Sequence, residues 1–109
     1  MSKKIFVLVP YMGRTDEELM RIREEALAKY QAKRPSDDAE LSIPEGKRLC
    51  GDMEAMLASD IVIGVRYHAA DAVCNLVEQA AYVYGKWVVD DREIENWLDE
   101  SDITGLEEE

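Results

Sequence analysis

The chain has 109 residues, of which 47% are hydrophobic and 34% charged, which suits one globular domain with a modest core. This length leaves no room for a second catalytic domain. There are 24 Asp and Glu against 13 Lys and Arg, a formal net charge of -11. Such a surface repels nucleic-acid phosphates and anionic lipid headgroups, which argues against long nucleic acid and membranes as partners.

The N-terminal residues and the cysteines indicate where in the cell the protein is expected. Residues 1–4 run directly into a predicted strand, without the apolar region and cleavage site of a signal peptide. No apolar run approaches the roughly 20 residues of a membrane span. Cys50 and Cys74 form no CxxC pair, so we expect two reduced core thiols in a cytosolic protein. From about residue 99 the chain is acidic, which predicts a solvated end.

The first predicted elements are a strand and a long helix. Residues 4–9 form a continuous apolar run rich in β-branched side chains, typical of a strand buried on both faces, and Pro10 ends it. Thr15 is a predicted N-cap for a helix over residues 16–33, whose first turn is acidic. Apolar residues recur at helical spacing along it: Leu19, Ile22, Ala26, Leu27 and Tyr30.

The remaining elements alternate between strands and helices. We expect a short strand over 39–43, a helix over 47–58, a strand over 60–65, a loop over 66–70, a helix over 72–84 with Gly85 as its C-terminal glycine, a strand over 86–89 and a helix over 90–98. The expected apolar faces of these three helices are Leu49, Met53, Met56 and Leu57; Val73, Leu76, Val77, Ala80 and Ala81; and Ile94, Trp97 and Leu98.

This alternation predicts the fold class. We expect one α/β domain over residues 1–109, a three-layer flavodoxin-like (Rossmann-like) fold with a four- to five-stranded, mainly parallel sheet and helices on both faces. Ligands of such sheets bind beyond the carboxyl ends of the strands. The cleft is therefore expected at loops 10–15 and 66–71 and after residue 89. A chain of this size often covers apolar helix faces by pairing, so a homo-oligomer remains open.

The loop after the first strand contains neither a dinucleotide-binding glycine pattern nor a Walker-type phosphate loop. It offers a tyrosine, an arginine and the backbone N–H groups of a helix start, which together suit a small anion. The alternative is an ordinary strand-to-helix turn with a surface arginine. The candidate residues are Pro10, Tyr11, Met12, Gly13, Arg14 and Thr15.

Other candidates follow the later strands. Asp52 lies in a first helical turn, where an acid is stabilising in any case. Glu78 is either a carboxylate nucleophile or part of a solvated helix face shared with Asn75 and Tyr82. His68, the only histidine, is either a ligand contact or a loop residue, and it has no Cys or His partner for a metal site.

Three segments, in order, resemble nucleoside 2-deoxyribosyltransferase-like proteins, and most closely a small branch found in bacteria and phages. They are the opening strand and loop over 4–15, the segment over 52–63 with Asp52 and Asp60 eight residues apart, and the glutamate-bearing helix over 74–89 that ends in Gly85-Lys86. Together they cover most of residues 4–90.

The resemblance implies a cofactor-free reaction at the N-glycosidic bond of a nucleoside or nucleoside monophosphate, either hydrolysis or 2-deoxyribosyl transfer. It implies Glu78 as nucleophile, Asp52 as acid/base or base contact, and Tyr11 as the orienting hydroxyl. It also implies Arg14 as a ligand contact, while His68 and Asn75 remain candidate ligand contacts from their place in the sequence. Active members place the nucleophile eight residues before the glycine, whereas Glu78 precedes Gly85 by seven. Either the helix end is shifted by one residue, or the nucleophile is lost.

Two alternatives to catalysis follow from the same residues. One is a binding module that kept the nucleotide cleft without turnover and sequesters a nucleotide. The other is an interaction protein that acts through its acidic surface.

Overall fold

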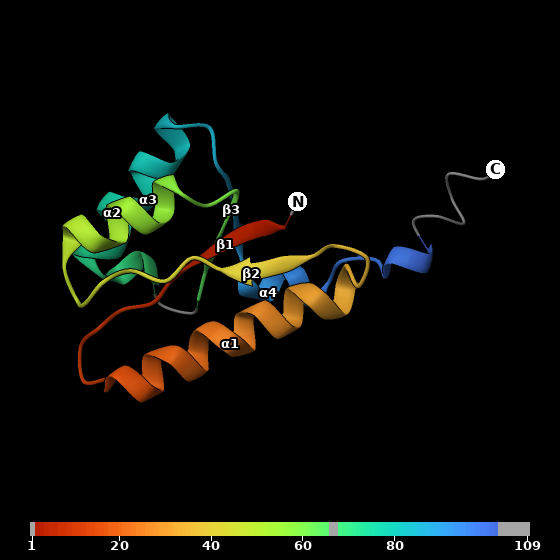
Figure 1. Cartoon of the computed structure of the whole chain (residues 1–109), viewed down its shortest axis with the longest axis horizontal. Helices are drawn as coiled ribbons and strands as arrows, with labels where there is room; N and C mark the ends of the chain where they lie inside the picture. The colour runs from red at the N-terminus through yellow and green to blue at the C-terminus, as the bar shows by residue number, and fades with distance from the viewer. Residues whose placement is uncertain (1, 66–67, 103–109) are drawn as a thin grey trace.

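The computed structural model describes residues 2–65 and 68–102, and these form a four-stranded, all-parallel sheet with helices on both faces (Figure 1). The elements are β1 (Lys3–Leu8), α1 (Asp16–Lys33), β2 (Ala39–Leu41), α2 (Leu49–Leu57), β3 (Ile61–Gly64), a 3-10 turn (His68–Ala70), α3 (Ala72–Val83), β4 (Trp87–Asp90) and α4 (Asp91–Glu95). The strand order is β2-β1-β3-β4. This is the predicted single flavodoxin-like domain, with four strands.

The two strongest predicted strands lie at the centre of the sheet. β1 pairs with β3 from Ile5–Ile61 to Leu8–Gly64. From Ile5 to Leu8 in β1, and throughout β3, the strands are buried on both faces because each face is covered by helices, which explains these apolar runs. The carboxyl ends of β1 and β3 therefore lie side by side where the strand order reverses, which is where ligands of such sheets bind.

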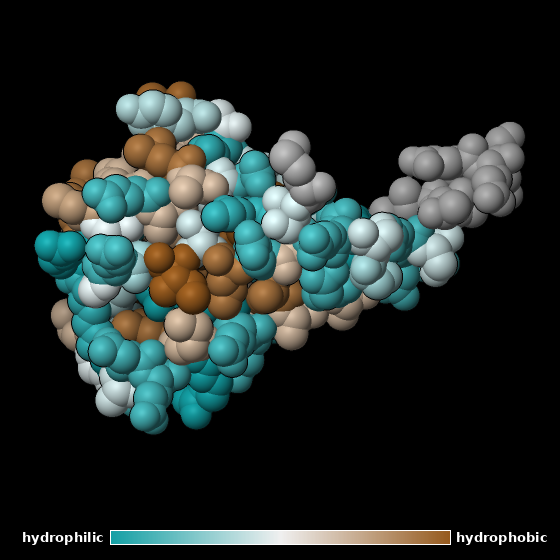
Figure 2. Space-filling view, in the orientation of Figure 1, coloured by the Kyte–Doolittle hydropathy of each residue, from teal (hydrophilic) through white to brown (hydrophobic). Residues whose placement is uncertain are grey.

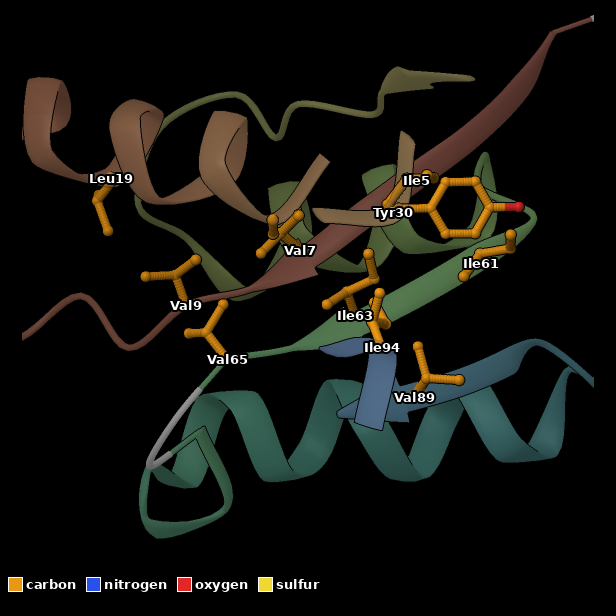
Figure 3. Packing of buried hydrophobic residues seen from close by; sticks show 11 residues of the cluster. Ile5, Val7, Val9, Leu19, Tyr30, Ile61, Ile63, Val65, Val89 and Ile94 are labelled. Atoms are coloured by element: carbon orange, nitrogen blue, oxygen red, sulfur yellow. The ribbon is translucent and has the colours of Figure 1, made fainter. Parts of the chain in front are cut away.

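Each face of the sheet has its own core. Figure 3 shows the first, in which Tyr30 of α1 and Ile94 of α4 pack on Val7 of β1 and Ile63 of β3. On the other face, Phe6 and Leu8 pack with residues of α2 and α3. The alternation along β1 sends odd-numbered side chains to one core and even-numbered ones to the other. This arrangement ties all four main helices to one central strand.

Helix α1 has the predicted bounds and cap. The Thr15 side chain accepts a hydrogen bond from the Glu18 backbone N–H at 3.2 Å, and three acidic residues occupy the first turn. Its buried stripe differs from the prediction, because it consists of Leu19, Arg23, Ala26 and Tyr30. An arginine therefore occupies a core position, which hydrophobic periodicity alone did not indicate.

Three predicted helix faces need correction. In α2 the buried residues include Gly51 and Asp52, while Leu49 and Leu57 are 39% and 45% exposed. The Gly51 position is packed so closely that a Cβ would lie 2.6 Å from the Glu45 carbonyl oxygen. This contact turns the Gly51–Asp52 side of the helix inward, and Leu49 and Leu57 outward.

In α3, Leu76 is 55% exposed although it was expected to face inward, while Cys74 is buried, as expected of a core thiol. The last helix is also shorter than predicted, since α4 ends at Glu95 and Leu98 is 53% exposed. Trp97 packs beyond the helix end, stacked on Trp87 with ring centroids 5.3 Å apart. Aromatic packing, not helical periodicity, therefore holds this last segment.

The face seen in Figure 2 carries many polar residues, in teal and white, while apolar side chains, in brown, lie near its centre and at its top. Both cysteines are free, but Cys50 is exposed, which corrects its prediction as a core thiol. Of the acidic end, Asp99 pairs with Lys33 at 3.2 Å and Glu100 accepts hydrogen bonds from Ser36, while residues 103–109 lie outside the described part. None of the described helices combines the length and hydropathy that a membrane crossing requires.

Candidate functional site

The candidate residues gather at the carboxyl edge of the sheet. Tyr11 follows β1, Asp52 lies in the first turn of α2, His68 follows β3, and Glu78 lies on α3. Four separate segments therefore supply the site, and the parallel sheet brings them to one edge. Arg66 and Tyr67, which the prediction included in the second cleft loop, lie outside the described residues.

The loop after β1 is a tight turn. The Arg14 backbone N–H donates to the Tyr11 carbonyl at 3.0 Å, and Gly13 between them has a φ of 74°, a conformation that favours glycine. The Arg14 guanidinium donates back to the Pro10 carbonyl at 2.8 Å. Arg14 thus braces the turn with at least one of its donors.

Tyr11 and Asp52 form the first pair of the site. The Tyr11 hydroxyl donates a hydrogen bond to Asp52 Oδ1. Asp52 is only 4% exposed, and this burial raises the pKa of its carboxyl despite opposing effects from Tyr11 and the positive charge of Arg23. Burial and the Asp52 carboxylate likewise raise the pKa of the Tyr11 hydroxyl. Burial therefore favours the protonated form of the Asp52 carboxyl more than in an exposed aspartate.

We expect the Asp52 carboxyl to make stability depend on pH. Because its pKa is raised above the ordinary value of 3.8, its contribution is fully present below pH 3.8 and is lost as pH rises through the raised pKa. The advantage of wild type over Asp52→Asn in free energy of unfolding should therefore shrink with rising pH. Urea titrations between about pH 3 and pH 8 measure this difference.

Tyr11→Phe serves as the control for that experiment. It removes the hydrogen bond that favours the ionised carboxyl, so the Asp52 pKa should rise further. The decline of the stability difference should then extend to higher pH. A difference between wild type and Asp52→Asn that grows with pH would contradict the raised pKa.

His68 and Glu78 form the second pair. The His68 Nε2 lies 3.0 Å from Glu78 Oε2, while Nδ1 lies 2.8 Å from the Val65 carbonyl oxygen. A carbonyl only accepts, so Nδ1 carries a proton; Nε2 and the carboxyl group then share a second proton. The side chains of His68 and Glu78 are 12% and 16% exposed. Glu78 is therefore turned inward and oriented by the imidazole, rather than standing on a solvated face.

Gly64 makes room for this pair. A Cβ at Gly64 would lie 2.5–2.7 Å from three atoms of the His68 ring. We expect Gly64→Ala to push the imidazole away from Glu78, which shifts the ring resonances of the only histidine and lowers stability. The same substitution in a His68→Ala background should lower the free energy of unfolding much less, because the added Cβ no longer meets the imidazole ring. NMR of the histidine ring and a double-mutant cycle of unfolding free energies measure both effects.

If Gly64→Ala lowered the free energy of unfolding equally with and without His68, the close packing of Gly64 against the imidazole would be contradicted. Unchanged ring resonances would contradict it as well.

Cys74 connects the two pairs. It is buried on the inner face of α3, and its backbone N–H donates to the Asp71 side chain at 2.9 Å. Burial, then the negative charges of Asp71, Asp52 and Glu78, raise the pKa of its thiol to about 12. The thiol is therefore neutral and no nucleophile.

The structure does not bring every candidate to this point. Arg14 lines a separate cavity of about 180 Å³ with Val65 and Asp91, on the α1 and α4 side of the sheet. Met12 is 88% exposed. Asn75 is exposed and lines a hollow on α3 with Leu76. The binding roles of these residues stay predictions.

The structure shows where Val77 and Glu78, the two residues at the offset position of α3, are placed. Val77, which occupies the position of the nucleophile in the resembled family, is fully buried in the core. Glu78 instead contacts His68 through Oε2, and its Oε1 lies 3.4 Å from the Tyr82 hydroxyl. Helix α3 ends at Val83 with Gly85 at a φ of 70°, as predicted for a C-terminal glycine.

Sequence reasoning missed two residues of the site. Gly64 ends a buried strand and gives no sequence signal for its contact with His68. Arg23 is four residues after Leu19 and three before Ala26, so helical spacing places it on the core stripe, and that signal was present in the sequence.

Comparisons with family models, with curated proteins and with solved structures find no match for this chain. Within residues 2–65 and 68–102, no group of three His, Cys, Asp or Glu side chains is arranged to hold a metal ion.

Proposed function

We propose that this protein acts on the N-glycosidic bond of a deoxynucleoside or its monophosphate, as a hydrolase or a 2-deoxyribosyltransferase. The observation that carries the proposal is the buried Asp52 carboxyl, which is hydrogen-bonded to Tyr11 and has a raised pKa. The inward-facing Glu78 of α3 supplies a second carboxyl group. Two carboxyl groups in different surroundings at one sheet edge suit a general acid and a nucleophile.

The proposed reaction divides the work between these groups. Glu78 Oε1 attacks the anomeric carbon while the carbon–nitrogen bond breaks, and the bonding electrons leave with the base. Asp52 donates its proton to the departing base, and Tyr11 holds the carboxyl in place. Water, or a second base, then attacks the glycosyl ester, restores Glu78 and returns a proton to Asp52. His68 orients Glu78 through its other oxygen.

A substrate panel tests the proposal. Purified protein is incubated with the deoxynucleosides and their 5′-monophosphates, and free base is measured by chromatography. Base release from at least one member is expected, and a second base added to the mixture gives a new nucleoside only if the enzyme transfers the sugar. No free base from any member would contradict the proposal.

A second function is favoured by one feature of Glu78. Both of its carboxylate oxygens have partners, at 3.0 Å from His68 and 3.4 Å from Tyr82, which lowers their reactivity toward carbon. A protein of this kind would bind and sequester a nucleotide without turnover. Calorimetry separates the two, because saturable binding without any free base supports sequestration.

A cytosolic location is part of the proposal. Both cysteines are free thiols, as expected in a reducing compartment. Fractionation of cells that express the protein measures its location.

A further inference from the structure

The proposed reaction leaves the buried guanidinium of Arg23 without a role. Arg23 lies on the core stripe of α1 and is 7% exposed. Its Nε is buried and has no hydrogen-bond partner among residues 2–65 and 68–102, and no ion pair found in that part of the chain includes it. A buried charge without a partner is costly, since the desolvation of the ion is not offset.

Arg23 borders a pocket between α1 and the connection from β2 to α2. The pocket measures about 180 Å³ and is also lined by Lys47, Asp16, Leu19, Ile43 and Pro44. Figure 1 shows the yellow β2–α2 connection running along the N-terminal half of α1. At roughly 30 Å³ for each water of the liquid, the volume admits about six waters, or one small anionic group. Two cationic side chains therefore line a space of the size of a phosphate with its nearest waters.

The charge of Arg23 acts on the Tyr11–Asp52 pair. Its positive charge opposes the effect of burial on the pKa values of both Asp52 and Tyr11. Arg23 is therefore close enough to the proposed general acid for its charge to act on that carboxyl. Among residues 2–65 and 68–102, no hydrogen bond or ion pair joins Asp52 to the guanidinium.

Lys47 is the second cation of the pocket, and its present contacts are easily exchanged. Its Nζ lies 3.4 Å from Asp16 Oδ1 and donates to the Arg14 carbonyl at 3.0 Å. The Asp16 side chain is 90% exposed, so this ion pair contributes little and can open to a stronger anion.

We propose that Arg23 and Lys47 form an anion site that takes the phosphate of a nucleoside 5′-monophosphate. The proposal rests on the proposed function and narrows its substrate class from nucleosides to their monophosphates. A guanidinium presents a planar fork that matches phosphate oxygens, and an ammonium adds a point charge, so the pair suits a dianion better than a neutral sugar.

The test compares Arg23→Met with Arg21→Met, which replaces an exposed arginine on the same helix. Without phosphate, Arg23→Met should melt at the same temperature as wild type or higher, because it removes an unpaired buried charge. Inorganic phosphate should raise the melting temperature of wild type and Arg21→Met, but not of Arg23→Met. By calorimetry, a deoxynucleoside 5′-monophosphate should bind wild type more tightly than its nucleoside, and Arg23→Met should weaken that binding roughly 10- to 100-fold.

Arg23→Lys provides a second variant that keeps the charge and loses the fork, so it should retain part of the preference for the monophosphate. A lower melting temperature of Arg23→Met with an unchanged phosphate effect would assign Arg23 a structural role and overturn the site. Equal phosphate effects in all variants would overturn it as well.

The readouts separate this site from the proposed reaction. If base is released equally from nucleosides and monophosphates, by wild type and Arg23→Met alike, the anion site fails and the reaction stands. If phosphate stabilises the protein through Arg23 but no base is released, the reaction fails and the anion site stands as a nucleotide-binding feature.

Discussion

Replacing Glu78 by glutamine is expected to lower the rate of base release by at least about a thousandfold, because the amide oxygen is a poor nucleophile. Glutamine has nearly the same shape, and its amide N–H can donate to His68 Nε2, so the fold and the neighbouring pair should be preserved. The measurement is free base per unit time on the best substrate of the panel, by chromatography.

The matched control for this prediction is Glu54→Gln, which changes an exposed glutamate on α2 and should leave the rate unchanged. A deoxyribosyl adduct on Glu78, found by mass spectrometry after rapid denaturation of wild type during turnover, would support covalent catalysis. Retention of more than about a tenth of the wild-type rate by Glu78→Gln would exclude Glu78 as the nucleophile.

The largest expected effect on stability is that of Phe6→Ala. Phe6 is 2% exposed on the central strand and packs with Met56 and Val77 in the core beneath α2 and α3. Removing the ring leaves a cavity between two helices and the sheet, which costs about 3–5 kcal/mol. A domain of this size has a total stability of roughly 5–15 kcal/mol, so the variant should lose about a fifth or more of it.

Urea unfolding measures this loss as a lower midpoint with a similar slope. Val83→Ala is the control, since Val83 is 81% exposed and its replacement should change the stability by less than about 0.5 kcal/mol. A loss below about 1 kcal/mol for Phe6→Ala would mean that the core closes around the missing ring.

The layers of this fold were predictable because they rest on local patterns. The runs over 4–9 and 60–65 are apolar on both faces, and only a covered parallel sheet accommodates such strands. Thr15 and the acidic residues after it fixed the start of α1. These patterns involve residues close together in the chain, so they can be recognised without knowledge of the tertiary contacts.

The inner faces of the shorter helices were less predictable because tertiary contacts decide them. Asp52 was expected in the first turn of α2, but its burial depends on Tyr11 from another loop and on the close approach of Gly51 to Glu45. The exposure of Leu76 likewise depends on which side of α3 meets Phe6. Periodicity identifies a stripe, and partners from distant segments choose its orientation.

The candidate site was predictable in its location and not in its pairings. The carboxyl ends of β1 and β3 follow from strand order, and Tyr11 with Asp52 was among the residues singled out. The partnership of His68 with Glu78 depends on a 3-10 turn and on the missing side chain of Gly64, neither of which has a sequence signature. Arg23 was overlooked because a charged residue is ordinarily assigned to the solvent side of a helix.

The central place of β1 also has a consequence for how the chain folds during synthesis. Ile5 pairs with Ile61, which is added 56 residues later. At roughly 5–20 residues per second, β1 waits about 3–11 s on the ribosome before its main partner β3 is made. Only the short strand β2 can pair with it sooner. The apolar residues of β1 therefore stay exposed during that time, and the folding of every layer depends on a contact that forms late.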